Sequence, residues 1–202
     1  MSRTLTPLEL SALALLTERP MHPYEMIQLL RQRGQDELVK VRTASLYHAV
    51  ERLLKARLVA DLGVDREGKR PERTVYRITS AGRSAVEVQV VSWLREPPRE
   101  FPVLPLAVGE AHFLSREQIA DALAERRTAV QDERDRHERH RRAAVAKGVP
   151  RRMLLGKEFV AQCLDAELAW IDSVVADLHS GELDWDQPYL HPTPNVSEKG
   201  QL

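Results

Sequence analysis

The sequence contains a single cysteine, Cys163, and lacks any long uninterrupted apolar run. One cysteine excludes an internal disulfide and a zinc site built from several cysteines, and it is typical of proteins that work in a reducing compartment. The only apolar stretch near the start, residues 10–16, is short and follows Glu9. Because a signal peptide or a membrane span needs a longer apolar segment, these absences predict a cytoplasmic protein that does not contact a membrane.

Motifs of the common enzyme classes are also missing. The chain has no glycine-rich phosphate loop, no nucleophile elbow and no metal-ligand spacing, so we expect no catalytic residue, no metal and no cofactor. His137 and His140 lie one turn apart among acidic residues, which leaves a metal site as one interpretation. A solvated, charged helix is the favoured one, and Cys163 is expected to be a packed, inert side chain.

Charge is unevenly distributed along the chain. Residues 1–83 carry 15 Lys and Arg against 10 Asp and Glu, whereas residues 84–202 carry 15 against 20. A basic first half and an acidic second half are typical of a nucleic-acid-binding module joined to a part that stays away from the polyanion. The composition, 43% hydrophobic and 30% charged residues, indicates a helix-rich globular protein with enough apolar material for a core.

Three helices are predicted in the first part of the chain. Thr6 and Glu9 have the spacing of a capping box that starts the first helix, and Pro20 ends it. His22 is expected to start the second helix, and Thr43 to cap the third. The positions of the third helix that are expected to face inward are Leu46, Val50, Leu53 and Leu54.

Two short β-branched segments, 58–64 and 74–78, follow the third helix and flank a polar tip at 65–73. They predict a β-hairpin. Three helices followed by a two-stranded hairpin is the element order of a winged helix-turn-helix, in which the third helix enters the DNA major groove while the wing touches backbone or minor groove. The chain is therefore expected to be mainly α-helical, with an N-terminal winged helix-turn-helix.

The second half predicts a helical domain. One helix is expected to reach residue 94, after which the prolines between 97 and 105 break the chain. A long helix starts near residue 116, and the last helix, about 151–178, carries an apolar stripe typical of packing on another helix. The expected parts are a winged-helix domain at 1–95, a helical dimerisation domain at 96–183 and a disordered tail at 184–202.

Four local motifs carry a family resemblance: LALL at 13–16, HPYE at 22–25, SLYHAVERL at 45–53 and YRITSAGR at 76–83. Together they resemble the PadR family of bacterial transcriptional regulators, and the second half is similar to the multi-helix dimerisation domain of one PadR subgroup. The departures from the family pattern are Pro23, Ala44 and Arg57, where glycine is common. Arginine tolerates a positive φ poorly, so the end of the third helix departs from the family at Arg57.

The resemblance implies a homodimeric repressor that binds an inverted-repeat DNA operator, with half-sites about one turn, or roughly 34 Å, apart. Tyr47 stands where a family tyrosine faces DNA, although a half-buried core tyrosine is the competing interpretation. Hydroxyl and basic side chains on the third helix and the wing favour phosphate or base contacts. The competing interpretation is that the same residues form a solvated basic face. The predicted DNA-binding residues are Arg42, Thr43, Ser45, Tyr47, His48, Arg52, Lys69, Arg70 and Arg73.

Family members that respond to small aromatic or drug-like effectors imply an effector pocket, with ordinary core packing as the competing interpretation. The candidate lining residues are Trp93, Phe101, Phe113 and Trp170. Packing on the partner subunit is expected for the apolar stripe of the last helix. That predicted dimer interface comprises Val160, Leu164, Leu168, Ile171, Val175 and Leu178.

The main alternative function is a winged-helix protein-protein interaction module that does not bind DNA specifically. Such a module would call for an acidic or apolar third helix. The third helix here carries Arg52 and Lys55 and is preceded by Arg42, so its outer face is basic. The sequence therefore favours DNA as the partner.

Overall fold

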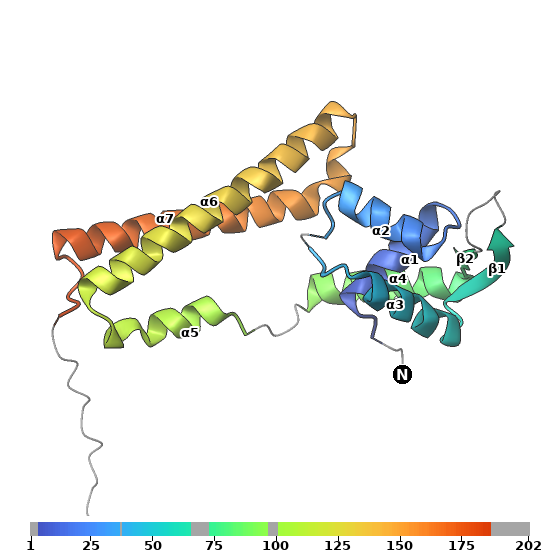
Figure 1. Cartoon of the computed structure of the whole chain (residues 1–202), viewed down its shortest axis with the longest axis horizontal. Coiled ribbons are helices and arrows are strands. Elements are labelled where there is room, and N and C mark those ends of the chain that lie inside the picture. The colour runs from blue at the N-terminus through green and yellow to red at the C-terminus, as the bar shows by residue number, and fades with distance from the viewer. Residues whose placement is uncertain (1–3, 37, 66–72, 97–100, 187–202) are drawn as a thin grey trace, which may run out of the picture. The chain divides into compact units, whose positions relative to one another are not determined.

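The computed structural model describes residues 4–36, 38–65, 73–96 and 101–186, whose helices and strands are shown in Figure 1. The described chain is mostly helical and has one two-stranded antiparallel sheet, as predicted for a winged helix-turn-helix followed by helices. It divides into two units, 1–100 and 101–202. None of the helices in the described residues is long and apolar enough to cross a membrane.

The first unit contains the winged helix-turn-helix and one further helix. Its elements are α1 (Pro7–Glu18), α2 (Pro23–Gln32), α3 (Thr43–Lys55), β1 (Val59–Asp65), β2 (Arg73–Ile78) and α4 (Ser80–Arg95). α1 packs on α3, α4 and β2, so it lies at the centre of the unit. Leu13 and Leu16 of α1, Leu30 of α2 and Leu53 of α3 are buried in one core, and this removal of apolar surface from water stabilises the unit.

The first two helices begin at the predicted caps. The Thr6 hydroxyl accepts from the backbone N–H of Glu9 at 3.3 Å, and the Glu9 carboxylate accepts from the backbone N–H of Thr6 at 2.9 Å. At α2, the Nδ1 atom of His22 accepts from the backbone N–H of Glu25 at 3.0 Å. Both predictions are confirmed, because a side chain satisfies an N–H group that the helix itself cannot pair.

The ends of α3 differ from the prediction. The N-cap is Arg42, whose carbonyl accepts the first helical bond from Leu46 at 3.0 Å, so the predicted cap at Thr43 is wrong by one position. Leu54 was expected in the core but is 36% exposed, because the 3.6-residue period places it at the edge of the face that buries Leu46 and Leu53. Arg57 follows the helix in the left-handed region, at a φ of 59°.

The hairpin has a short third partner that the sequence analysis missed. β1 and β2 pair antiparallel, with a register shift between Asp61 and Val64 next to Gly63, whose φ is 94°. Met21, between α1 and α2, forms an isolated bridge with Tyr76, and each backbone N–H donates to the other carbonyl at 3.1 Å. This bridge ties the base of the wing to the start of α2.

The second unit is an antiparallel pair of long helices with short elements before each. Its elements are α5 (Val103–Gly109), the 3-10 turn η1 (Ala111–Phe113), α6 (Arg116–Ala146), the 3-10 turn η2 (Arg151–Met153) and α7 (Leu155–Ser180). α6 and α7 pack side by side (Figure 1). Ser115 starts α6 with a second capping box, which includes the side chain of Gln118.

The apolar stripe of α7 is covered by α6 of the same chain. Ile171 and Leu178 are 0% exposed and belong to one core cluster with residues of α6, and Leu164 and Leu168 form another with Val130. Val160 and Val175 are half-buried beside these clusters. The predicted dimer interface at Val160, Leu164, Leu168, Ile171, Val175 and Leu178 is therefore corrected, since an apolar stripe indicates that a helix packs on another without saying whose helix it is.

Ion pairs flank the contact between α6 and α7 and explain why α6 is so polar. Arg126 pairs with Glu167 at 2.6 Å, and Arg134 pairs with Asp165 at 2.8 Å. The hydrogen bond from the Arg127 guanidinium, at 2.5 Å, lowers the pKa of Asp172. Exposed pairs of this kind contribute little one by one, but they orient two polar helix edges toward each other.

Two residues of the predicted tail are bound to the second unit. The indole N–H of Trp185 donates to the carbonyl of Leu114 at 2.9 Å, and Asp186 accepts from Arg116 at 3.0 Å. The disordered tail predicted at 184–202 therefore does not begin at 184. Residues 187–202 lie outside the described residues, and the division at residues 95 and 183 stays a prediction.

Candidate nucleic-acid interface

α3 has one buried face and one exposed polar face. Leu46, Ala49, Val50 and Leu53 are buried in the core of the first unit, and this burial fixes the rotation of the helix. The exposed members of the predicted DNA-binding set on α3 and its N-cap are Arg42, Thr43, Ser45, Tyr47, His48 and Arg52. The structure thus brings these six residues together on the side of α3 that points away from the core.

The first turn of α3 is open to an anion. The N-cap Arg42 makes no side-chain hydrogen bond to the helix, so the N–H groups of the first turn are not covered by a capping side chain. Those N–H groups and the positive end of the helix dipole favour a negatively charged group such as a phosphate. Thr43 and Ser45 are exposed at the same turn, where their hydroxyls can add to such a contact.

Tyr47 and His48 are both accessible to a ligand. Tyr47 is 42% exposed, so part of its side chain is accessible, and the choice between a DNA-facing and a half-buried core tyrosine stays a prediction. The Nδ1 atom of His48 lies 3.4 Å from the Glu51 carboxylate one turn later, and both side chains are exposed. A phenol and an imidazole in this position are suited to hydrogen bonding with DNA sugars, phosphates or base edges.

Arg52 is placed differently from the other five. Its Nε atom donates to the Glu9 carboxylate at 2.8 Å, although Glu9 lies on α1, 43 residues away. The Arg52 side chain is 47% exposed, whereas Glu9 is 0% exposed. Sequence reasoning interpreted Glu9 only as a capping-box residue and missed this second partner, because nothing in the local pattern signals it.

The described part of the wing contains one predicted DNA-binding residue. The Arg73 guanidinium carbon lies 4.6 Å from the centre of the Tyr24 ring, a cation-π contact between β2 and the start of α2. Tyr24 is 43% exposed and was not among the predicted residues. The other two predicted wing residues, Lys69 and Arg70, lie outside the described residues.

Comparison with known families bears directly on this surface. The sequence matches the family described as "Transcriptional regulator PadR-like family" over residues 12–88. That range begins within α1 and ends within α4, so it includes α3 and the wing. Residues 12–88 thus resemble the PadR-like family. No curated protein matches the chain in sequence.

Solved structures share the PadR winged-helix fold over most of this chain. Bacillus subtilis PadR in complex with operator DNA has a TM-score of 0.74 at 13% identity, covering 87% of this chain and 99% of that one. The same protein in complex with p-coumaric acid has a TM-score of 0.69 at 14% identity, covering 86% and 98%. A PadR-like regulator from Bacillus cereus has a TM-score of 0.62 at 10% identity, covering 86% and 99%.

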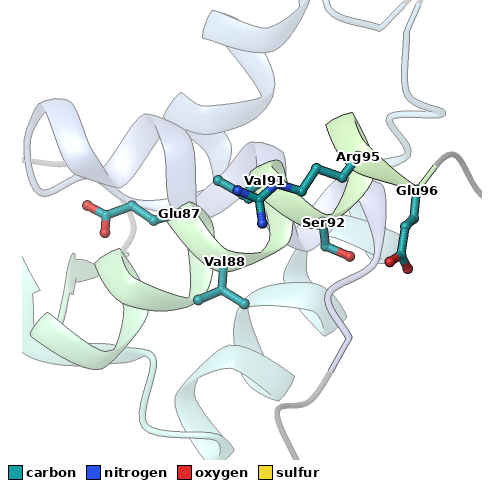
Figure 2. A pocket seen from close by; sticks show the side chains of 6 residues that line it. All are labelled: Glu87, Val88, Val91, Ser92, Arg95 and Glu96. Atoms are coloured by element: carbon teal, nitrogen blue, oxygen red, sulfur yellow. The ribbon is translucent and has the colours of Figure 1, made fainter.

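The groove on α4, the helix that closes the PadR-like match, lacks the predicted effector residues. It has a volume of about 450 Å³, and its six lining side chains, including Val88 and Val91, all come from α4 or its C-cap (Figure 2). Trp93 is half-buried on α4 but does not line the groove. Phe101 and Phe113 are 78% and 80% exposed in the second unit, and Trp170 is 36% exposed there. Trp93 belongs to the first unit and the other three residues to the second. The structure therefore does not test whether the four form one pocket, and the effector set stays a prediction.

The part of the chain that follows the PadR-like domain carries a second apolar face on α7. Leu155 and Phe159 are 53% and 67% exposed, and Cys163 is exposed as well, so it is not the packed cysteine that was predicted. With Trp170, these residues recur at spacings of four and seven, which places them on one side of the helix. This set of four residues is called the outward face of α7 below.

His137 also differs from the prediction of a fully solvated helix. It is 3% exposed, and its Nε2 atom lies 4.0 Å from the Glu133 carboxylate one turn before it. His140 is exposed, as expected. The described residues hold no group of three His, Cys, Asp or Glu side chains placed to bind a metal ion.

Proposed function

We propose that the chain is a transcriptional repressor that binds double-stranded operator DNA through the exposed face of α3 and through the wing. The observation that carries the proposal is that exposed polar and basic face within a PadR-like domain. In winged helix-turn-helix proteins, the corresponding helix enters the major groove, where side chains reach base edges. The operator complex of Bacillus subtilis PadR, a protein of the same fold, supports this assignment.

The contacts divide by chemistry. Thr43, Ser45 and the first-turn N–H groups of α3 bind a phosphate, which sets the register of the protein on the duplex. Arg42, at the N-cap, and Tyr47, in the second turn of α3, contact base edges and sugars. Arg73, together with Lys69 and Arg70 of the wing tip, binds backbone phosphates on the flank of the site.

The repressor acts in the cytoplasm as a homodimer on an inverted repeat. The outward face of α7 is the proposed seam, because α6 already covers the opposite stripe. From Leu155 to Trp170 this face extends over roughly 22 Å at the rise of an α-helix. Burying side chains as exposed as Phe159 against the same face of a second copy contributes about 1.5 to 3 kcal/mol each.

A small aromatic effector is proposed to release the DNA. Support comes from the complex of Bacillus subtilis PadR with p-coumaric acid, because that protein shares the fold. Such an effector weakens operator binding only if it binds the DNA-free arrangement of the dimer more tightly than the DNA-bound one. The test is a titration of p-coumaric acid into the protein-operator complex, with benzoic acid as a control of the same charge.

The experiment that tests DNA binding is a titration of the purified chain against the promoter of its own gene. A scrambled duplex of the same length is the control, and two salt concentrations separate phosphate contacts from base readout. The proposal predicts that the promoter binds at least about a hundredfold more tightly than the scrambled duplex, with affinity falling as salt rises. Equal binding to both duplexes would instead support the interaction-module alternative.

A further inference from the structure

Glu9 is a charged side chain in the core of the first unit. It is 0% exposed, and a buried carboxylate is stable only when its oxygens are paired. One oxygen, Oε2, accepts from the backbone N–H of Thr6 at 2.9 Å, as the capping box requires. The other, Oε1, accepts from Nε of Arg52 at 2.8 Å, so the carboxylate joins the start of α1 to the middle of α3.

Arg52 lies on the exposed side of α3. It follows Ser45 by seven residues and His48 by four, which places the three side chains on one face of the helix. The bond to Glu9 uses the Nε donor, and an arginine carries four further N–H donors on its terminal nitrogens. The Arg52 side chain is thus hydrogen-bonded to a buried carboxylate while 47% of its surface is exposed.

We propose that Glu9 is a positioning residue for DNA binding, which fixes the Arg52 guanidinium so that its terminal N–H groups face the DNA backbone. This inference rests on the proposed operator binding through α3. A mobile arginine side chain loses several rotamers when it binds a phosphate, whereas one held by a carboxylate has already lost them. Glu9 itself stays inside the core and does not touch DNA.

A hydrogen bond to α4 also holds this arrangement in place. The buried side chain of Gln89 on α4 accepts from the backbone N–H of Leu5 at 2.9 Å. Leu5 directly precedes the capping box, so α4 anchors the segment from which Glu9 reaches Arg52. The position of the guanidinium is therefore set by α1, α3 and α4 together, independently of any DNA.

The test compares operator affinities of wild type, E9Q, E51Q, R52Q and the double variant E9Q/R52Q at several salt concentrations. Each titration is made at a temperature at which circular dichroism shows that variant to be folded. Removing a negative charge near a polyanion tightens binding by itself, whereas losing a positioning residue weakens it. If Glu9 is only a nearby negative charge, E9Q should raise the operator affinity. If it is a positioning residue, E9Q should lower it. E51Q is the matched control, because it removes one charge from the exposed surface of α3.

We expect E9Q to weaken operator binding about tenfold and E51Q to leave it unchanged or tighten it. R52Q weakens binding and lowers the slope of log affinity against log salt by about one, as the loss of one phosphate contact requires. In the R52Q background, E9Q no longer weakens binding, because Glu9 acts as a positioning residue only through Arg52.

Wild-type or tighter binding by E9Q overturns the inference, and so does an unchanged salt slope in R52Q. If E9Q does not fold, R52K replaces it: a lysine keeps the charge but lacks the planar fork that Glu9 holds, so its operator binding is expected to be weaker than that of wild type and stronger than that of R52Q. Wild-type affinity in R52K then overturns the inference. Failure of the proposed function is distinct, since wild type itself would not prefer the promoter over the scrambled duplex.

Discussion

The backbone N–H of Arg57, at a φ of 59°, donates to the carbonyl of Leu54 at 2.9 Å. The next residue, Leu58, donates to the carbonyl of Leu53 at 3.0 Å, and the two bonds form the closing pattern of a Schellman motif. Glycine is the usual residue at the left-handed position, because any Cβ there crowds the backbone. Arg57 therefore ends α3 under strain.

Relief of that strain is the first prediction. R57G is expected to raise the free energy of unfolding by up to about 1 kcal/mol, since the gain at positive φ exceeds the greater freedom of glycine in the unfolded chain. Urea unfolding followed by circular dichroism measures it. R57A is the control, because it removes the same charge but keeps a Cβ, and it should not be stabilised. A gain in R57A equal to that in R57G would assign the effect to charge.

At Gly82, in contrast, adding a side chain is expected to destabilise the protein. A Cβ built at this residue lies 2.2 Å from the carbonyl oxygen of Leu58 and 2.8 Å from the Ile78 side chain, both of which are fixed by the wing. G82A is expected to lower the free energy of unfolding by about 3 kcal/mol or more, since backbone must move. G109A is the control, because no heavy atom lies within 4 Å of its Cβ. Equal midpoints for both variants in urea would refute the close approach at Gly82.

Acid is predicted to loosen the second unit through Glu138. Hydrogen bonds from Arg141 and Arg142 lower the pKa of Glu138 to about 2, from an ordinary value of 4.5. Because the folded pKa is below the unfolded one, the stabilisation is complete above pH 4.5 and is lost as the pH falls toward 2. Unfolding followed between those pH values should therefore be less pH-dependent in E138Q than in wild type. Glu125, an exposed residue of the same helix, supplies the control E125Q. An unchanged acid response in E138Q would contradict the assignment.

The two sides of α7 are predicted to respond differently to a charge. I171D places a carboxylate at a site that is 0% exposed, so the second unit should lose about 3 kcal/mol or more of stability. F159E changes a side chain that is 67% exposed, so the subunit should stay folded but become monomeric. Light scattering gives the mass, and circular dichroism the helix content. A folded dimer of F159E would remove the outward face of α7 as the seam.

Local signals were enough to predict much of the fold. Capping residues such as Thr6 and His22 act on N–H groups within three residues, so their sequence pattern carries the whole interaction. The helix-helix-helix-hairpin order likewise follows from periodicity and turn residues. The exposed face of α3 was predictable because apolar residues recur at helical spacing on the opposite side of the same helix.

Contacts between distant segments were not predictable in the same way. The bond between Glu9 and Arg52 and the bridge between Met21 and Tyr76 join residues that are far apart in the chain, and no local pattern marks either pair. The stripe of α7 was correctly interpreted as a packing surface, but its partner is α6 of the same chain, because periodicity does not distinguish one apolar helix from another. Arg52 was predicted only as a DNA contact, since its buried partner lies 43 residues before it.

Hydroxyl-radical footprinting of the protein on the promoter of its own gene tests the central claim most directly. If two copies of the exposed face of α3 bind an inverted repeat, two protected segments of equal length should appear, with centres about one helical turn, or roughly 10 base pairs, apart. A variant of the first turn, S45A, should weaken both segments together. One protected segment, or protection that moves freely along the duplex, would contradict a dimer that binds specifically through α3.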